Sequence, residues 1–263
     1  MSKAFAKETD LVLAFRGWLQ ERRWSTSTIP NGDGWTVYPE TAGWDLLLAH
    51  DAHGMQIGIE AKLSLNAKVL EQALPPYRWA AEVGPDYRAV LVPGDSCQHH
   101  MASLAAHLGV TVITIDAEHE EYERRRGRFW RCTAELPTEI REYSDRNWFS
   151  WLPTTRETLP EYVPDVCGGD SAPVALTPWK VKAIKLLILL ERRGAVTRRD
   201  MKALELSPSR WTAPYHGFLA PSPDGYVRYE RTPDLKAQHP RNWAEIEADF
   251  DRWNPDAQPD QTQ

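Results

Sequence analysis

Two short apolar runs decide the fold of this chain: WDLLL at residues 44–48 and IGIEAKL at residues 57–63. Each run has the length and composition of a β-strand, and the polar, glycine-containing segment between them suits a tight hairpin. An unpaired charge inside an apolar strand is costly. The charged residues Asp45, Glu60 and Lys62 therefore need a reason to be there, and a divalent metal ion is one such reason.

Side-chain alternation along a strand predicts which of these groups meet. Glu60 and Lys62 are two residues apart and point to one face of the strand, whereas their apolar neighbours point into a core. If the hairpin loop has an even number of residues, Asp45 falls on the same face and pairs directly with Glu60 or Lys62. A three-residue bulged loop would place Asp45 on the opposite face.

Two carboxylates beside a lysine suit a magnesium site. Mg²⁺ prefers oxygen ligands and typically takes one or two carboxylates together with water and substrate phosphate. Asp45 and Glu60 would supply the carboxylates and the Ala61 carbonyl a third ligand, for Mg²⁺ or Mn²⁺. Such a metal lowers the pKa of a water and neutralises charge on a scissile phosphate. Lys62 could orient or help to deprotonate that water, because local charge and desolvation readily move the pKa of a lysine.

This arrangement resembles the PD-(D/E)XK nuclease superfamily, which has the restriction-endonuclease-like fold. The matching residues are Asp45 and, on the following strand, Glu60-Ala61-Lys62. The resemblance implies an α/β domain with a mixed sheet flanked by helices. It also implies that Asp45 and Glu60 bind metal and that Lys62 is the catalytic lysine. Trp44 stands where the family often has a proline.

Two further residues resemble accessory groups of RecB-like nucleases. Apolar residues at helical spacing predict a helix over residues 5–24, and Glu8 lies on its inward stripe, like the helix-borne glutamate of those nucleases. The alternative for Glu8 is a first-turn acid favoured by the helix dipole. Gln72 and Tyr77 resemble the Q-x-x-x-Y element, with one residue more between them and intervening prolines. Gln72 is expected to assist the site, and Tyr77 to pack.

The segments around the hairpin predict the order helix, three strands, helix, strand, helix, strand. This is the order of the superfamily, so the nuclease-like domain is expected to cover residues 1–117. Besides the first helix and the two hairpin strands, the expected elements lie, in chain order, at residues 36–38, 66–74, 87–92, 97–108 and 110–115.

Composition limits the compartment and the cofactors. A chain of 263 residues suits one or two domains, and no apolar run is long enough to span a bilayer. No secretory signal is visible, and three widely spaced cysteines favour reduced thiols, so a cytoplasmic protein is expected. Cys97 with His99, His100 and His107 could be imagined as a zinc site, but helix-surface residues are the favoured interpretation.

Charge is distributed unevenly along the chain. The net charge is −6, yet residues 176–240 contain twelve Lys and Arg against six Asp and Glu. This segment therefore carries +6 and the remainder −12, which predicts an anionic partner for the basic part. Residues 118–175, between the two parts, are expected to form a charged and proline-rich linker.

The basic segment has a helical pattern of its own. A helix is expected over 178–193, a second from Thr197 to about residue 204, and a third from Ser207-Pro208. The turn PDG then leads into the alternating strand YVRYE. Three helices and a hairpin resemble a small α+β winged-helix DNA-binding domain over 176–240. A final helix over 243–253 and a disordered tail would complete residues 241–263.

The winged-helix resemblance implies a set of DNA contacts. The third helix would enter the major groove, and the wing would contact phosphate. Pro214 departs from the pattern, because it would kink or end the third helix after about two turns. Winged helices also serve as protein-interaction modules. The residues expected to contact DNA are Arg210 on the third helix, Arg198, Arg199 and Lys202 beside it, and Arg228 and Arg231 in the wing.

Together these features predict a cytoplasmic, metal-dependent deoxyribonuclease that hydrolyses DNA phosphodiester bonds. A non-catalytic DNA-binding or assembly protein that retains the nuclease fold is the alternative, and an enzyme acting on RNA is a third interpretation. Many relatives of the superfamily act as dimers, so a homodimer is a further expectation.

Overall fold

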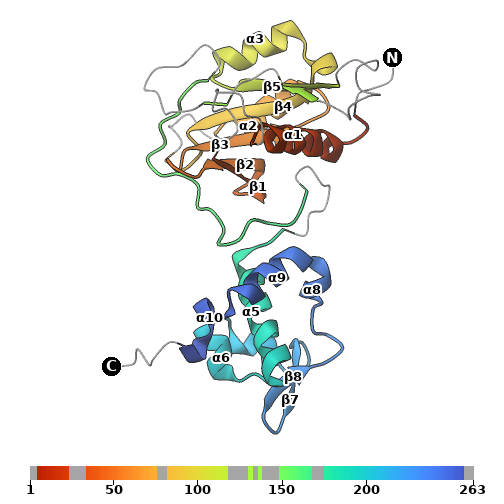
Figure 1. Ribbon diagram of the computed structural model, residues 1–263, viewed down its shortest axis with the longest axis vertical. Coiled ribbons are helices and arrows are strands. Elements are labelled where there is room, and N and C mark those ends of the chain that lie inside the picture. Colours follow the sequence, from red (N-terminus) through yellow and green to blue (C-terminus); the bar gives the residue numbers. More distant parts are fainter. Residues whose placement is uncertain are drawn as a thin grey trace. The chain divides into compact units, whose positions relative to one another are not determined.

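The computed structural model describes residues 5–23, 34–75, 82–117, 130–132, 136–137, 148–167 and 175–257. The chain divides into two compact units (Figure 1). Unit 1 comprises Met1–Leu159 and Val166–Pro173, and unit 2 comprises Pro160–Asp165 and Val174–Gln263. Among the described helices, none is both long and apolar enough to cross a membrane.

Unit 1 is built on a mixed sheet of six strands whose order in space follows their order in the chain. The first three strands pair antiparallel, β3, β4 and β5 pair parallel, and β6 returns antiparallel to β5. The strands are β1 (Trp35–Thr41), β2 (Trp44–His50), β3 (Gln56–Ala61), β4 (Tyr87–Pro93), β5 (Thr111–Ala117) and β6 (Trp130–Cys132).

Helices cover both faces of this sheet. The predicted order of helices and strands is confirmed up to β5, with a short 3-10 turn, η1, added before α3. Asn66 caps α2 by accepting a hydrogen bond from the Val69 N–H (3.2 Å). The helical elements are α1 (Glu8–Arg23), α2 (Ala67–Ala73), η1 (Gly94–Ser96) and α3 (His99–His107).

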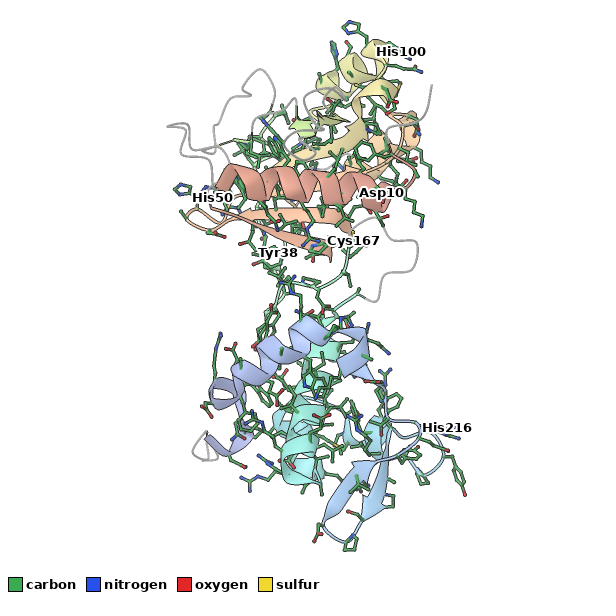
Figure 2. The ribbon with its side chains drawn as sticks, turned by 45° about the vertical axis from the view of Figure 1, so that its right-hand side comes forward. Asp10, Tyr38, His50, His100, Cys167 and His216 are labelled. Atoms are coloured by element: carbon green, nitrogen blue, oxygen red, sulfur yellow. The ribbon has the colours of Figure 1, made fainter. Side chains whose placement is uncertain are left out.

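The alternation of side chains in the central strands divides the apolar residues of unit 1 between two cores. Leu46, Leu48 and Ile59 are fully buried in the core that includes α1. Leu47 and Val90 are fully buried in the second core, which includes residues of α2 and α3. Figure 2 shows α1 lying along the sheet. Both faces of the sheet are therefore buried, as expected for an α/β domain.

The hairpin between β2 and β3 meets the condition that brings Asp45 to Glu60. Leu46 pairs with Ile59, and Ala49 pairs with Gln56, so six residues separate the last paired positions. This number is even. The paired positions end at Leu46 and Ile59, and beyond them the Asp45 carboxylate reaches β3 by accepting a hydrogen bond from the Ala61 N–H (2.7 Å).

Trp44 has a packing role in front of Asp45. Its indole lies over Gly58, where an added Cβ atom would come within 2.4 Å of the ring. The buried Arg88 guanidinium lies 5.3 Å from the centroid of the Trp44 ring and 5.1 Å from that of Trp151. Trp44 thus anchors the start of β2 against β3 and β4.

Unit 2 contains helices and a two-stranded hairpin. The predicted helix over 178–193 is confirmed as α5, and Gly194 ends it with a left-handed φ of 79°. An isolated antiparallel bridge joins Val196 to Tyr226 of β8 beside the hairpin. The elements are α5 (Pro178–Arg193), α6 (Arg198–Ala203), α7 (Pro208–Thr212), β7 (Leu219–Ser222), β8 (Gly225–Arg228), α8 (Leu235–Gln238), α9 (Pro240–Ala248), α10 (Phe250–Trp253) and η2 (Pro255–Ala257).

The prediction of one final helix over 243–253 is wrong, because the structure has two helices there, α9 and α10, separated at Asp249. The Trp253 indole N–H donates to the Ile246 carbonyl (2.7 Å), which a continuous helix would pair with the N–H of Phe250. The side chain of Trp253 therefore takes the place of a backbone donor and ends α9.

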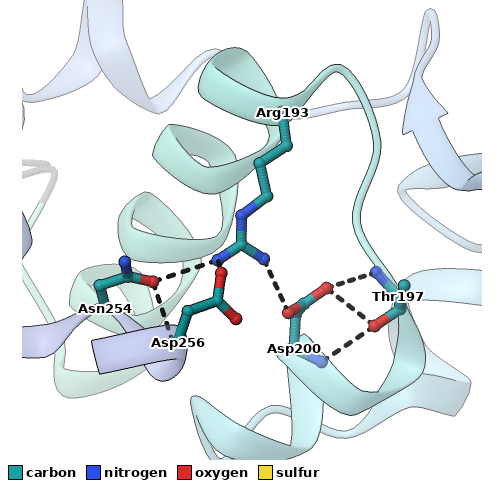
Figure 3. A network of polar contacts seen from close by, with 5 residues as sticks. All are labelled: Arg193, Thr197, Asp200, Asn254 and Asp256. Carbon is teal, nitrogen blue, oxygen red and sulfur yellow. Dashed lines mark hydrogen bonds and ion pairs between the residues drawn. The ribbon is translucent and has the colours of Figure 1, made fainter. Parts of the chain in front are cut away.

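A capping box begins α6 in the way the sequence predicts. The Thr197 hydroxyl accepts a hydrogen bond from the Asp200 N–H, and the Asp200 carboxylate accepts one from the Thr197 N–H (2.7 Å). Arg193 donates to Asp200 (3.0 Å) and also to Asn254 and Asp256 (Figure 3). Arg193 thus connects the end of α5 to the first turn of α6 and to the last described turn of the chain.

The two units divide the chain differently from the expected domains. Trp243 and Ile246 are buried in the core of unit 2, so residues 241–257 are part of that unit. The backbone N–H of Trp151 donates to the backbone carbonyl of Asp86 (2.9 Å), and this bond attaches part of the expected linker to unit 1. Most of residues 118–147 and the expected disordered tail after residue 257 lie outside the described residues.

Replacing Gly58 by alanine should destabilise unit 1, because the new methyl group would enter the space of the Trp44 indole. Overpacking of this kind costs about 1–3 kcal/mol. Urea denaturation followed by circular dichroism measures the change. Gly17→Ala is the matched control, since it lies within α1 with no atom within 4 Å of its added Cβ and should stabilise by about 0.5–1 kcal/mol. Equal midpoints for the two variants would contradict this packing argument.

Candidate active site

Lys62 and three carboxylates gather where β3 ends and β2 begins. The Lys62 Nζ atom lies 3.2 Å from Asp45 Oδ2 and 3.2 Å from Glu8 Oε2. Asp45 Oδ2 also accepts a hydrogen bond from the backbone N–H of Ala61 (2.7 Å). The charges of all three of these side chains affect the pKa of Glu60. We refer to Glu8, Asp45, Glu60 and Lys62 as the carboxylate–lysine cluster.

The backbone around β3 holds this cluster in place. β3 ends at Ala61, but the Lys62 N–H still donates to the Leu91 carbonyl of β4 (3.0 Å). The sheet pairing therefore extends one residue further and fixes where the Lys62 side chain starts. The bond from the Ala61 amide to Asp45 holds the aspartate across the same pair of strands.

The two acids in the first turn of α1 have different partners. Asp10, labelled in Figure 2, accepts a hydrogen bond from the Lys7 N–H (3.1 Å) just before the helix begins. Glu8 instead forms an ion pair with Lys62. Glu8 thus belongs to the cluster as well as to a helix start that favours negative charge.

Glu60 is the most deeply buried member of the cluster. The residue is only 6% exposed, and no hydrogen bond among the described residues reaches its carboxylate. Burial raises the pKa of Glu60 to about 7, and repulsion from Asp45, Glu40 and Glu8 adds to this effect while Lys62 opposes it. The cluster therefore holds more negative charge than its lysine neutralises.

Lys62 responds to the same charges in the opposite direction. Burial alone would lower the pKa of its ammonium group, but the carboxylates of Asp45 and Glu8 outweigh that effect and raise the pKa above its ordinary value. Lys62 is therefore a protonated amine at neutral pH.

The sequence predicts a magnesium ion at this cluster, and the protein would supply only part of its ligand shell. The described residues contain no group of three or more His, Cys, Asp or Glu side chains placed to hold a metal. Mg²⁺ commonly takes only one or two protein carboxylates and completes its shell with water and phosphate. Asp45 and Glu60 would supply those two, with the Ala61 carbonyl beside them. The imagined zinc group on α3 gains no support, and His100 points away from unit 1 (Figure 2).

The sequence patterns did not identify Glu40, and they predicted that Gln72 would assist the site. Glu40 precedes the tight turn between β1 and β2, in which Ala42 and Gly43 both have positive φ, and its charge raises the pKa of Glu60. The turn-forming pair Ala42-Gly43 could have indicated that Glu40 lies beside the start of β2. Gln72 is exposed on α2, with no described contact to the cluster. Tyr77 lies outside the described residues.

Four of the basic residues expected to contact DNA lie on α6 or α7. Arg210 lies on this five-residue helix, with its guanidinium 4.7 Å from the centroid of the Trp179 ring. The Arg198 side chain donates to the Thr212 hydroxyl (3.4 Å). Arg199 and Lys202 are exposed on α6. The helix ends at Thr212, earlier than the two turns expected.

The two expected wing residues already bind protein groups. Arg228 lies 3.4 Å from the carboxylate of Glu191, which also pairs with Lys236 (3.1 Å). Arg231 donates to the backbone carbonyl of Tyr215. Both arginines are exposed, so these contacts leave them open to solvent.

The stability of unit 1 should fall as the pH rises through the titration of Glu60. The pKa of Glu60 is about 7 in the folded chain, against 4.5 as its ordinary value, so its full contribution to stability is present below about pH 4.5 and is lost as the pH rises through about 7. With solvent screening allowed for, the loss is about 2 kcal/mol. Urea denaturation at several pH values measures it.

Glu60→Gln is the control for this pH dependence, because glutamine keeps the shape and cannot titrate. The difference in unfolding free energy between the wild type and this variant should change over pH 4.5–7 and should shrink when Mg²⁺ is added to the wild type at high pH. Parallel pH profiles for the two proteins would show that Glu60 titrates normally.

No protein-family model, no curated protein and no solved structure matches this chain. The likeness of Asp45, Glu60, Ala61 and Lys62 to the PD-(D/E)XK motif therefore remains a prediction that rests on the residues themselves.

Proposed function

We propose that the chain is a metal-dependent nuclease that hydrolyses DNA phosphodiester bonds at the carboxylate–lysine cluster of unit 1. The observation that carries this proposal is the burial of Glu60, which is 6% exposed, in one cluster with Asp45 and Lys62. A structural ion pair alone would not need the second buried carboxylate. A divalent cation would relieve the repulsion between Asp45 and Glu60, which gives the fold a reason to keep both acids.

Each member of the cluster has a task in this proposal. Asp45 and Glu60 would hold Mg²⁺ or Mn²⁺, together with the carbonyl of Ala61. The metal, when bound, supplies charge neutralisation at the phosphate and acidifies a water. Lys62 pairs with the phosphate as a cation, a role that suits its raised pKa better than removal of a proton does. Glu8 positions Lys62 through their ion pair.

Unit 2 supports the assignment of nucleic acid as the substrate. The order α5, the Val196 bridge, α6, α7 and the β7–β8 hairpin is similar to that of a winged helix. We propose that its exposed basic residues bind the phosphate backbone of DNA. Such contacts would bring the polymer to a chain whose overall charge is −6 and which would otherwise repel it.

A second candidate is a DNA-binding or assembly protein that keeps the fold without catalysis. The ion pairs of Lys62 with both Asp45 and Glu8 favour this alternative, because they occupy the lysine with protein carboxylates. In that case the cluster would stabilise unit 1, and its loss would change folding rather than DNA cleavage.

Substitution of the cluster tests the two candidates against each other. Asp45→Asn, Glu60→Gln and Lys62→Met should each reduce cleavage of plasmid and linear DNA in Mg²⁺ or Mn²⁺ by about 10²- to 10⁴-fold, the range typical of groups that act on the reacting atoms. Gel analysis of nicked and linear products measures the rate.

Lys68→Met on α2 is the matched control, because Lys68 is an exposed lysine of unit 1 outside the cluster, and it should cleave like the wild type. Wild-type protein that binds DNA and breaks no strand under any of these conditions would favour the non-catalytic alternative.

The salt dependence of DNA binding should identify the phosphate contacts of unit 2. Lys202→Ala should reduce the slope of log K against log salt concentration by about 1 and weaken binding to all sequences alike. Fluorescence anisotropy with a labelled duplex measures both quantities. Lys182→Ala is the control, since Lys182 forms an ion pair with Glu205 (2.5 Å) and should leave the slope unchanged. An unaltered slope for Lys202→Ala would remove this residue from the interface.

A further inference from the structure

Tyr215 is the most exposed large apolar side chain among the described residues. It is 80% exposed and lies between α7 and β7, in a segment that starts where α7 ends. Its neighbour His216 is also exposed and points away from unit 2 (Figure 2). Neither side chain contributes to the apolar core of the unit.

The turn that carries Tyr215 is nevertheless firmly built. The Gly217 N–H donates to the Ala213 carbonyl (2.9 Å), and a Cβ atom at Gly217 would come within 2.7 Å of backbone atoms, so only glycine fits there. The Phe218 N–H donates to the Trp211 carbonyl (3.0 Å). These bonds close the turn on itself and fix the position of Tyr215.

A second segment of unit 2 holds the same turn from outside. Tyr229 donates to the Gly217 carbonyl (2.5 Å), Thr232 donates to the Phe218 carbonyl (2.7 Å), and Arg231 donates to the Tyr215 carbonyl. Three side chains thus bind three backbone carbonyls. An exposed aromatic ring is thereby presented on a pre-organised backbone, which lowers the entropic cost of binding a ligand.

The charges around this turn favour an anionic ligand. Several acids of unit 2 are bound in ion pairs, such as Glu205 with Lys182 and Asp200 with Arg193. Three arginines, Arg198, Arg210 and Arg231, form no ion pair with any described residue, and one exposed acid next to Arg231, Glu230, forms none either. Arg198 reaches Thr212 at the end of α7, and Arg231 reaches the turn itself.

We propose that Tyr215 is a stacking platform for an unpaired nucleobase, with Arg198, Arg210 and Arg231 binding the flanking phosphates. This inference rests on the proposed binding of nucleic acid by unit 2 and goes beyond it, because it names single-stranded or locally unpaired nucleic acid as the preferred ligand. Aromatic rings stack on any base, so this contact tolerates all sequences.

The short α7 is consistent with a ligand other than an intact duplex. A reading helix places several consecutive side chains against base edges in the major groove. α7 has five residues and ends before the exposed turn, so Tyr215 and not a long helix face is the prominent feature of this surface. A ring can stack only on a base whose face is uncovered, as it is in single strands, ends and branched junctions.

Binding of fluorescein-labelled oligonucleotides of about 16 nucleotides, measured by anisotropy, tests the proposal. Tyr215→Ala should weaken binding to single strands and to duplexes with an unpaired tail by about 5- to 150-fold. Tyr215→Phe should bind like the wild type, because the ring does the stacking. Blunt duplex affinity should be the same for all three proteins. Parallel DNA and RNA arms decide which single strand is preferred.

Photocrosslinking supplies a readout that a general loss of affinity cannot imitate. A single strand that contains 5-iodouracil should crosslink to the peptide carrying Tyr215, as identified by mass spectrometry. Phe149→Ala, which removes an exposed ring from unit 1, should leave binding and crosslinking unchanged. The thermal midpoint of Tyr215→Ala should match the wild type, since the side chain lies outside the core.

Equal affinities of Tyr215→Ala and the wild type for every unpaired DNA and RNA would overturn the stacking role and leave the exposed ring to a protein partner. A wild type that binds no nucleic acid would overturn the stacking role and the DNA-binding role of unit 2 together. A Tyr215 effect in a protein that never cleaves DNA would sustain the stacking proposal and remove the nuclease.

Discussion

The pairing of β2 with β3 in a single register is the constraint on which unit 1 depends. Leu46 and Leu48 enter the core beside α1, and Leu47 enters the core on the other face of the sheet. A slip of one residue would exchange these faces and break the hydrogen bond between the Ala61 N–H and Asp45. Because both faces are buried, apolar packing holds the register strongly, and the same register keeps the charged side chains together.

The candidate site is a place where the fold tolerates charge that it does not neutralise. Lys62 is shared between Asp45 and Glu8, and Glu60 remains buried with a raised pKa. Such a group costs folding free energy unless a ligand compensates it. A stable sheet with an anchor such as Trp44 over Gly58 can carry that cost. Binding of the proposed cation would offset this cost, because the cation would relieve the repulsion between the carboxylates.

Unit 2 shows how little a net charge says about a surface. Acids in this unit form ion pairs that connect its helices, as Asp200 does with Arg193 and Glu191 with Lys236. Other cations, among them Arg198 and Arg231, carry no ionic partner among the described residues and lie near one exposed turn. These arginines are open to a ligand, which the composition of the segment alone could not indicate.

Local patterns were enough to predict the order of elements in unit 1, because apolar alternation, helical spacing and terminators such as Gly109 after α3 act over a few residues. They also predicted that Asp45, Glu60 and Lys62 could meet, since strand geometry relates them. The folded structure was needed to show that Trp253 divides the last helix and that Gln72 faces solvent. These outcomes depend on contacts between segments far apart in the chain or on competition for one carbonyl, and a local pattern carries no information about either.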